Sequence, residues 1–299
     1  MADEHFKAQD ARSYEPVVGH FDRFTERYTV PLAHRLVDLA GVRAESRWLD
    51  LATGTGVVAR AVGEGRGIGG DLSMGMLVRA KSQRTEAPVT WTRLDAERLP
   101  FASQGFDAVV CLFGLLHFPD SERALVEMKR ILRPGGRVVV AVGSGPSRWT
   151  PEGWFDGARR LRALAERRLG RRLEAPRFLD ELVNHHLPAA AEPTESPLAQ
   201  GHRSRAHIVP KLMRQAGFCD VEVAWEGHEA VIDGMEDFWD LQATFSSRAR
   251  KRLAAASAEE RELVREIFQA ECQAVLRRGG RLIYPYAALF VAGRRPEVS

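Results

Sequence analysis

Three acidic residues and two glycines form the part of this sequence best suited to bind a ligand. Asp50 ends a short apolar run, and the turn Gly54-Thr55-Gly56 follows it. Glycines in such a turn let the backbone approach a ligand closely and adopt dihedral angles that other residues avoid. Asp71 ends the next apolar run. An acid at that position can accept hydrogen bonds from both hydroxyls of a ribose, as in dinucleotide-binding folds.

Asp95 is the third acid, and it ends a third apolar run. Its carboxylate could accept a hydrogen bond from the exocyclic amine of adenine, with Ala96 presenting its backbone amide. Structural alternatives stay open, because Asp71 or Ser73 could cap the next helix and Asp95 could be a solvated surface acid. No Lys-Ser or Lys-Thr pair follows the glycines, as a nucleotide-hydrolysing phosphate loop requires. Together the three positions favour a nucleoside site without a phosphate-binding loop.

The elements around these residues must bring the ends of several strands together. Short apolar runs alternate with helix-like segments over residues 47–142. We predict strands at 47–51, 67–70, 89–93, 106–112 and 137–142, and helices at 57–62, 73–80 and 121–132. This alternation predicts a parallel sheet with helices on both faces. Ligands bind such sheets beyond the carboxyl ends of the strands, which is where the three acids lie.

The remaining segments predict a cap around this core. The pattern returns with a helix near 208–216, a strand near 218–225 and an apolar strand at 286–292, with Pro285 at the entrance of that strand because proline cannot donate to a ladder. The predicted divisions are an N-terminal helical arm at 1–45, a cofactor-binding core at 46–143, a helical cap insert at 144–206, a core continuation at 207–226, a second helical insert at 227–281, and a final strand and tail at 282–299.

The composition is that of a globular protein. The 299 residues are 44% hydrophobic and 28% charged, with a net charge of +3 that does not call for nucleic acid. No apolar run reaches the roughly 18–20 residues of a membrane span, and the polar N-terminus is not a secretory signal. Cys111, Cys219 and Cys272 fit neither a disulfide framework nor a zinc site. We expect a cytoplasmic protein with a small-molecule substrate, no metal, and no nucleic-acid or membrane partner; the oligomeric state stays open.

Taken as a set, the motifs resemble those of class I S-adenosylmethionine-dependent methyltransferases of the small-molecule type, such as the quinone-biosynthesis C-methyltransferases. The matching segments are Asp50-x-x-x-Gly54-x-Gly56, Gly70-Asp71-x-Ser73-x-x-Met76-Leu77, Asp95-Ala96-Glu97-x-Leu99-Pro100-Phe101 and Leu116-His117-Phe118-x-Asp120. The resemblance implies an α/β, Rossmann-like, doubly wound sheet of seven mostly parallel strands with an antiparallel last strand, plus a helical cap from inserted segments. One departure is Ala52, where relatives usually carry glycine.

The resemblance also assigns positions around the cofactor, S-adenosylmethionine. Those around its methionine part are Asp50, Ala52, Gly54 and Gly56. Those near its ribose and adenine are Asp71, Leu72, Ser73, Met74 or Met76, Asp95 and Ala96. Tyr28 and Arg27, from the N-terminal arm, would close over the methionine tail; the alternative is a core aromatic and a surface arginine.

A catalytic base is needed only where the methyl acceptor must lose a proton. His117 is the candidate, because it follows the fourth strand and imidazole suits proton transfer near neutral pH. The alternative is a structural histidine bonded to a loop carbonyl. His185 and His186 are adjacent and are expected at the surface.

The acceptor pocket must come from the cap. Its aromatic residues are Trp149, Trp154, Phe155, Phe178, Phe238, Trp239 and Phe245; we expect most of them in the core and some in the wall of an apolar pocket. The arginine-rich segment 159–172 could clamp an anionic substrate. The sequence favours the other interpretation, a solvated helix face with Leu161, Ala165 and Leu169 packed inward.

The predicted activity is methyl transfer to a carbon or oxygen of a small, largely apolar metabolite, in specialised metabolism. Two alternatives remain. One is a related enzyme that binds S-adenosylmethionine but catalyses a cyclisation or rearrangement. The other is a non-catalytic binding protein.

Overall fold

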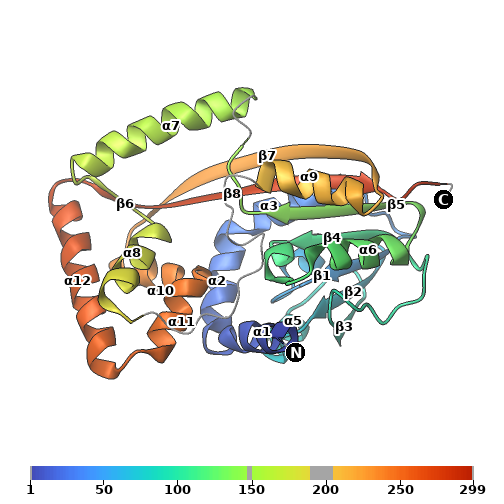
Figure 1. Cartoon of the computed structure of the whole chain (residues 1–299), viewed down its shortest axis with the longest axis horizontal. Helices are drawn as coiled ribbons and strands as arrows, with labels where there is room; N and C mark the ends of the chain where they lie inside the picture. The colour runs from blue at the N-terminus through green and yellow to red at the C-terminus, as the bar shows by residue number, and fades with distance from the viewer. Residues whose placement is uncertain (1, 147–149, 189–204, 298–299) are drawn as a thin grey trace.

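The protein is built on one mixed sheet, seen edge-on in Figure 1. A computed structural model describes residues 2–146, 150–188 and 205–297. Within these residues the strand order is β3-β2-β1-β4-β5-β8-β6, and β7 pairs with β8. The strands are β1 (Arg47–Leu51), β2 (Arg66–Asp71), β3 (Val89–Arg93), β4 (Phe106–Leu112), β5 (Leu132–Val142), β6 (Arg172–Glu174), β7 (Cys219–Ile232) and β8 (Arg281–Arg294).

Helices cover both faces of the sheet and form a cap at one end of it. The helices before and among the first strands are α1 (Ala2–Ser13), α2 (Val18–Tyr28), α3 (Val30–Ala40), α4 (Val57–Ala61), α5 (Met74–Ser82) and α6 (Ser121–Ile131). The later helices are α7 (Pro151–Arg168), α8 (Arg177–His186), α9 (Arg205–Gln215), α10 (Met235–Phe245), α11 (Ser247–Ala255) and α12 (Ala258–Arg277). Short 3-10 turns lie at Glu15–Val17 and Gly114–His117.

The parallel half of the sheet is packed around two tryptophans. β1 pairs with β2 and β4, and β2 pairs with β3, all in parallel. The glycines of β2 leave room for the rings, since a Cβ at Gly67 would lie 2.1 Å from the Trp48 ring and one at Gly69 would lie 2.4 Å from Trp91. The glycine content of β2 therefore reflects close ring packing, which places the carboxyl ends of β1, β2 and β3 side by side.

The predicted fold class is confirmed, with one strand more than expected. β8 runs antiparallel to β5 and β7, while the other core strands are parallel. The additional strand, β6, comes from the first insert and pairs in parallel with the beginning of β8. The predicted domain boundaries stay predictions. Helix α3 of the N-terminal arm packs on the sheet, where Leu32 and Leu36 are buried beside Trp48.

The prediction for Pro285 was wrong, because β8 begins at Arg281 and Pro285 lies inside it. Pro285 is opposite Glu229 of β7. On the other edge of β8, pairing with β6 ends at Ile283 and pairing with β5 begins at Leu289. Pro285 thus falls in a stretch with a partner strand on one edge only, where its missing N–H is tolerated.

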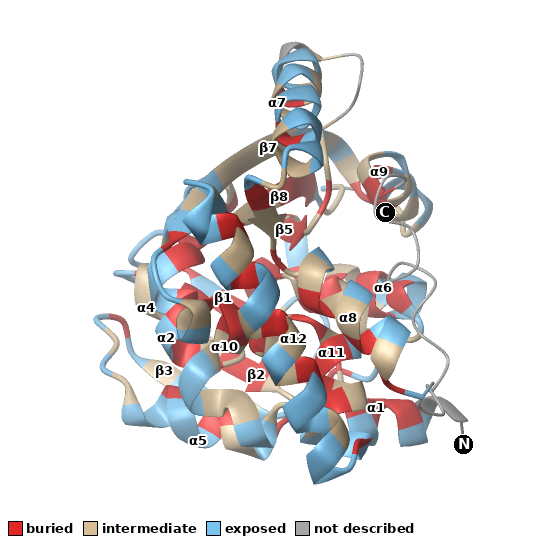
Figure 2. Cartoon of the chain, turned by 90° about the vertical axis from the view of Figure 1, so that its left-hand side faces the viewer, coloured by how far each residue is buried: buried red, intermediate tan, exposed pale blue. Residues whose placement is uncertain are grey.

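The cap has a hydrophobic core of its own. Its largest fully buried side chains include Phe24, Phe238 and Phe268, from α2, α10 and α12. Helix α7 does not join this core and lies along the outside of β7 and β8 (Figure 1); Figure 2 shows it at the outer edge of the molecule, mostly exposed. No helix in the described part of the chain has both the length and the apolar character to cross a membrane.

Candidate functional site

A cavity of about 680 Å³ lies at the carboxyl ends of the first strands and extends under the cap. Most of the predicted ligand-binding positions line it. These are Tyr28, Ala52, Gly54, Asp71, Leu72, Ser73, Met76, Asp95, Ala96 and His117. The structure places Asp50, Gly56 and the exposed Met74 and Arg27 outside the lining.

Asp71 connects the loop after β1 to the loop after β2. The backbone N–H of Gly54 donates to its Oδ2 at 2.9 Å, and that of Ser73 donates to its Oδ1 at 2.9 Å. Burial raises the pKa of Asp71. Each carboxylate oxygen can accept a second hydrogen bond, so the carboxylate can hold these loops and still accept from ribose hydroxyls. The cap of α5 is Ser73, whose hydroxyl accepts from the N–H of Met76.

Asp50 and Gly56 shape the glycine loop from behind. The Thr53 hydroxyl donates to Asp50 Oδ2 at 2.5 Å, and Asp50 Oδ1 has no partner among the described residues. Burial, with the nearby charge of Asp71, raises the pKa of Asp50 to about 7. Gly56 has a φ of 86°, and a Cβ there would lie 2.8 Å from the Trp91 ring. Both residues therefore support the loop without lining the cavity.

Asp95 lies in the cavity wall and is bound by a residue that sequence reasoning missed. Lys7, from α1, donates to Asp95 Oδ2 at 2.9 Å and to Glu97 Oε2 at 2.5 Å. Burial alone would lower the pKa of Lys7, but these two carboxylates raise it overall. Ion pairs with both acids thus hold α1 against the Asp95 side of the cavity. No local pattern in the sequence connects Lys7 to residues so far along the chain.

His117 is held by α1 as well. Its Nδ1 lies 2.9 Å from Asp10 Oδ2, and its Nε2 lies 3.4 Å from the Tyr14 hydroxyl. Burial would raise the pKa of Asp10, but His117, Lys251 and Arg250 lower it to about 2. An ionised Asp10 accepts a hydrogen bond from Nδ1–H of His117, which leaves Nε2 unprotonated and able to accept a proton. This arrangement suits a base. The partner of His117 is the carboxylate of Asp10 and not the loop carbonyl that the alternative interpretation expected.

Aromatic side chains form a continuous arc from the glycine loop into the cap. Phe21 lies over Gly54, where an added Cβ would be 3.6 Å from its ring. Successive ring centroids along the arc are 5.7 Å apart for Phe21–Phe245, 5.9 Å for Phe245–Tyr284, 5.5 Å for Tyr284–Tyr286 and 5.2 Å for Tyr286–His228. All five residues line the cavity. The arc gives the part of the cavity under the cap a largely apolar wall of aromatic rings.

Among the described aromatic candidates, Phe245 lines the cavity, and the expectation of core packing is met by three others. Phe178, Phe238 and Trp239 pack in the core of the cap, because their rings stack around Phe268. Trp154 and Phe155 are exposed on α7. Trp149 lies outside the described residues, and His185 and His186 do not line the cavity. Tyr284, Tyr286 and His228 were missed, because the strands predicted at 218–225 and 286–292 were shorter than β7 and β8 and residues 227–281 were expected to be a helical insert.

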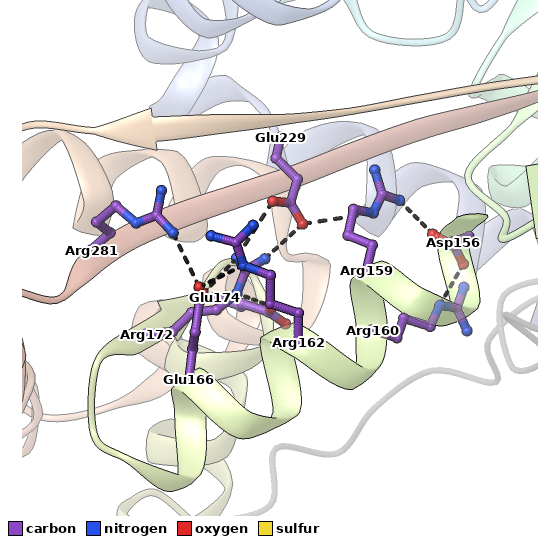
Figure 3. A network of polar contacts seen from close by, with 9 residues as sticks. All are labelled: Asp156, Arg159, Arg160, Arg162, Glu166, Arg172, Glu174, Glu229 and Arg281. Carbon is purple, nitrogen blue, oxygen red and sulfur yellow. Dashed lines mark hydrogen bonds and ion pairs between the residues drawn. The ribbon is translucent and has the colours of Figure 1, made fainter. Parts of the chain in front are cut away.

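Only part of the arginine-rich segment faces inward, through Arg159 and Arg172, and the prediction that Leu161, Ala165 and Leu169 pack inward was wrong. These three residues are exposed. The inner face of α7 instead carries Asp156, Arg159 and Glu166, in the ion-pair network of Figure 3. Glu229 of β7 and Glu174 of β6 supply the partners that turn the charged face toward the protein.

Arg172 is the buried centre of this network. Its side chain is only 5% exposed and lies 2.6 Å from Glu174, 2.7 Å from Glu229 and 3.4 Å from Glu166 (Figure 3). Burial would lower the pKa of Arg172, but these carboxylates raise it. Arg281 of β8 also pairs with Glu166. The arginines of this network have carboxylate partners, so it attaches α7 to β6, β7 and β8.

Three residues of the cavity wall carry buried hydroxyls that a polar ligand could satisfy. Thr25, Tyr28 and Thr55 line the cavity and have side-chain oxygens without a partner among the described residues. Buried polar atoms of this kind are satisfied by a ligand or by water. Thr55 belongs to the glycine loop that Asp71 holds, and Thr25 and Tyr28 come from α2. The donor set thus fits a nucleoside with a polar tail.

Comparisons with known proteins agree with this geometry. Residues 49–140 match a family model described as a methyltransferase domain. Over 112 residues the chain is 44% identical to demethylmenaquinone methyltransferase from Thermus thermophilus, covering 36% of this chain and 51% of the relative. Over 151 residues it is 34% identical to a ubiquinone/menaquinone biosynthesis C-methyltransferase from Hahella chejuensis, covering 46% of this chain and 60% of the relative. The chain thus spans between half and two thirds of these relatives.

The fold extends over more of the chain than the sequence match. The YcgJ protein from Bacillus subtilis superposes with a TM-score of 0.52 at 20% identity, covering 89% of this chain and 98% of that one. A methyltransferase candidate from Bacillus halodurans gives a TM-score of 0.51 at 18% identity, covering 88% and 98%. These likenesses concern the fold alone.

Proposed function

We propose that this chain, whose residues 49–140 form a class I S-adenosylmethionine-dependent methyltransferase domain, transfers the methyl group of that cofactor to a carbon or oxygen of a small, largely apolar metabolite. The observation that carries the proposal is the single cavity that joins the glycine loop, Asp71 and Asp95 to the aromatic arc. One end suits the cofactor and the other suits an acceptor. A role in specialised metabolism is part of this proposal.

The cofactor end is assigned from the residues that face it. Asp71 accepts from the ribose hydroxyls, Asp95 and Ala96 lie at the adenine edge, and Leu72 and Met76 flank them. Ala52 and Gly54 let the backbone approach the methionine part, and the hydroxyls of Thr25 and Tyr28 are available to its polar tail. When bound, S-adenosylmethionine supplies a methyl group already activated on a sulfonium sulfur. The protein therefore needs mainly to align the acceptor, and positioning alone contributes about 7–11 kcal/mol.

His117 accepts a proton where the acceptor is a phenol, an enol or a related carbon acid. Nε2 is the atom that takes the proton, since Nδ1 is engaged by Asp10. The ionised Asp10 then stabilises the imidazolium, and general base catalysis of this type contributes about 10²- to 10⁴-fold in rate. Tyr14 donates to the same Nε2 at 3.4 Å, so this long contact must give way to the acceptor hydroxyl.

The aromatic arc favours a flat, largely apolar acceptor. Phe245, Tyr284 and Tyr286 stack on one another and line the cavity, and such an aromatic wall suits a planar, largely apolar substrate. The names of the relatives point the same way, because they act in menaquinone and ubiquinone biosynthesis. We therefore include a quinone-like phenol or hydroquinone in the substrate class proposed for this protein.

The test is turnover with S-adenosylmethionine and a panel of monocyclic and bicyclic phenols and hydroquinones. Mass spectrometry should show a methylated product and S-adenosylhomocysteine in equal amounts. An isomerised product with the cofactor unconsumed would instead assign a cyclisation or rearrangement. Absence of cofactor binding by calorimetry would assign a non-catalytic role.

A further inference from the structure

The outward face of α7 is apolar. Phe155 is 78% exposed, Leu161 70% and Leu169 66%, and Trp154 and Leu164 are exposed beside them. Figures 1 and 2 both place this helix at the outer edge of the molecule. Large apolar side chains gathered on one exposed helix face mark a contact surface, whereas single ones scattered over a protein do not.

Helix α7 is amphipathic, but its apolar face is exposed and its charged face packs against the protein. Trp154, Ala158, Leu161 and Ala165 recur at three- and four-residue steps and are all exposed. The intervening Asp156 is buried, and Arg159 and Glu166 are half-buried in the ion-pair network of Figure 3. Ion pairs therefore hold the inner face of α7 against the protein. Its apolar outer face is exposed.

The charges on the outward side have one sign. Between residues 154 and 169 every exposed charged residue is an arginine, namely Arg160, Arg162 and Arg168. Arg162 is 76% exposed and lies among the outward leucines, although its Nε pairs with Glu166 at 3.1 Å; Arg168 is exposed on the same side. A second copy of this face would oppose arginine to arginine, since the exposed acid of α7, Glu152, lies in its first turn, before the apolar side chains. An anionic surface, in contrast, complements both the arginines and the apolar side chains.

We propose that α7 docks on the surface of an anionic lipid bilayer, with Phe155, Leu161 and Leu169 in the interface and Arg162 and Arg168 at the headgroups. Aromatic and leucine side chains beside basic residues are the pattern of helices that lie in the membrane interface. Long arginine side chains reach the headgroups while their stems lie along the apolar face. The sequence-based expectation of no membrane partner considered only spanning segments, and an interfacial helix needs none.

The position of α7 also gives the docking a consequence for the cavity. Asp156, Arg159 and Ala163 on its inner face line the cavity that extends under the cap. Docking thus places that part of the cavity next to the lipid. This step rests on the proposed function: an apolar acceptor dissolved in the bilayer would reach the aromatic arc without crossing water.

Co-sedimentation with vesicles tests the docking directly and without cofactor. The wild-type protein should bind vesicles of phosphatidylglycerol and phosphatidylcholine more strongly than vesicles of phosphatidylcholine alone, and added salt should weaken the binding. The double variant Phe155→Ser/Leu161→Ser should bind about tenfold more weakly, because its interfacial apolar area is lost. The variant Arg162→Glu/Arg168→Glu should lose the preference for the anionic vesicles.

Leu263→Ser is the matched control, because Leu263 on α12 is 49% exposed and lies outside this face; it should bind as the wild type does. All variants should retain cofactor affinity by calorimetry, which shows that they fold and separates this test from that of the methyl transfer. Wild-type protein that stays in the supernatant with anionic vesicles would overturn the proposal. So would a wild-type dimer that Phe155→Ser/Leu161→Ser converts to a monomer, since the face would then join two copies.

Discussion

At the scale of single residues, the proposed proton transfer depends on how Asp10 orients His117. The 2.9 Å contact between them joins the first helix of the chain to the turn after β4. Asp10 is 6% exposed and Lys251 lies 3.4 Å from its other oxygen, so its carboxylate is held from both sides. The imidazole therefore keeps one orientation toward the cavity, which a base must have before an acceptor arrives.

Replacing His117 with alanine removes the proposed base. We expect turnover of a phenolic acceptor to fall about 10²-fold or more, with cofactor affinity unchanged. Steady-state kinetics together with calorimetry would separate the two effects. A turnover rate equal to that of the wild type would assign His117 to support of the loop.

Asp10 makes the free energy of unfolding depend on pH in the acidic range. Its folded-state pKa of about 2 lies below the ordinary value of 3.8, so its contribution to stability is complete above pH 3.8 and is lost as the pH falls toward 2. The loss amounts to about 2 kcal/mol. In denaturant titrations from pH 5 to pH 2, Asp10→Asn should be less stable than wild type at pH 5 and converge with it at pH 2. A constant difference would contradict the assignment.

Asp71→Ala tests the ribose assignment. Loss of a charge-assisted hydrogen bond costs about 1–3 kcal/mol of cofactor binding, measurable by calorimetry. The carboxylate also accepts hydrogen bonds from the N–H groups of Gly54 and Ser73. Asp71→Asn should therefore be measured together with the alanine variant, because it changes the side chain least. Unchanged affinity in the alanine variant would leave Asp71 with a purely structural role.

At the scale of elements, the local sequence pattern predicted the strands of the sheet, but it did not predict which face of α7 packs against the protein. The strand bounds at 47–51, 89–93 and 106–112 were correct, because each is a short apolar run between turns. The prediction failed for α7, since the side of a helix that faces inward depends on partners such as Glu229, distant in sequence. The sequence did not identify Lys7, Asp10 and Tyr14 as site residues for the same reason, because their partners are far along the chain.

The attachment of α7 depends on Arg172. Replacing this buried arginine with methionine leaves Glu174 and Glu229 without their main partner, at a cost of about 3–5 kcal/mol. We expect faster hydrogen exchange and proteolysis in α7, with the β1–β4 region unaffected. Arg168→Met, an exposed position on the same helix, is the control. Equal protection of α7 in both variants would show that other contacts attach it.

At the scale of the whole molecule, the cavity is closed by parts far apart in the chain. The sheet provides Asp71 and Asp95, α1 covers Asp95 through Lys7, and α2 provides Tyr28 beside the tyrosines of β8. A ligand that reaches from Asp95 to Tyr28 must therefore contact both the sheet and the cap. Binding should then stabilise the two together.

This coupling predicts different protection by two ligands of different length. S-adenosylhomocysteine at 100 times its Kd should raise the free energy of unfolding by about 2.7 kcal/mol. It should slow hydrogen exchange in α1, in α2 and in the loops after β1 and β2, because in the proposed binding mode its nucleoside would face Asp71 and Asp95 and its amino-acid tail would reach Tyr28. Adenosine at the same saturation lacks that tail, so it should protect α1 and the loops but leave α2 exchanging as in the free protein. Protection of α2 by adenosine, or its absence with S-adenosylhomocysteine, would show that Tyr28 does not contact the cofactor tail and would confine the cofactor site to the sheet.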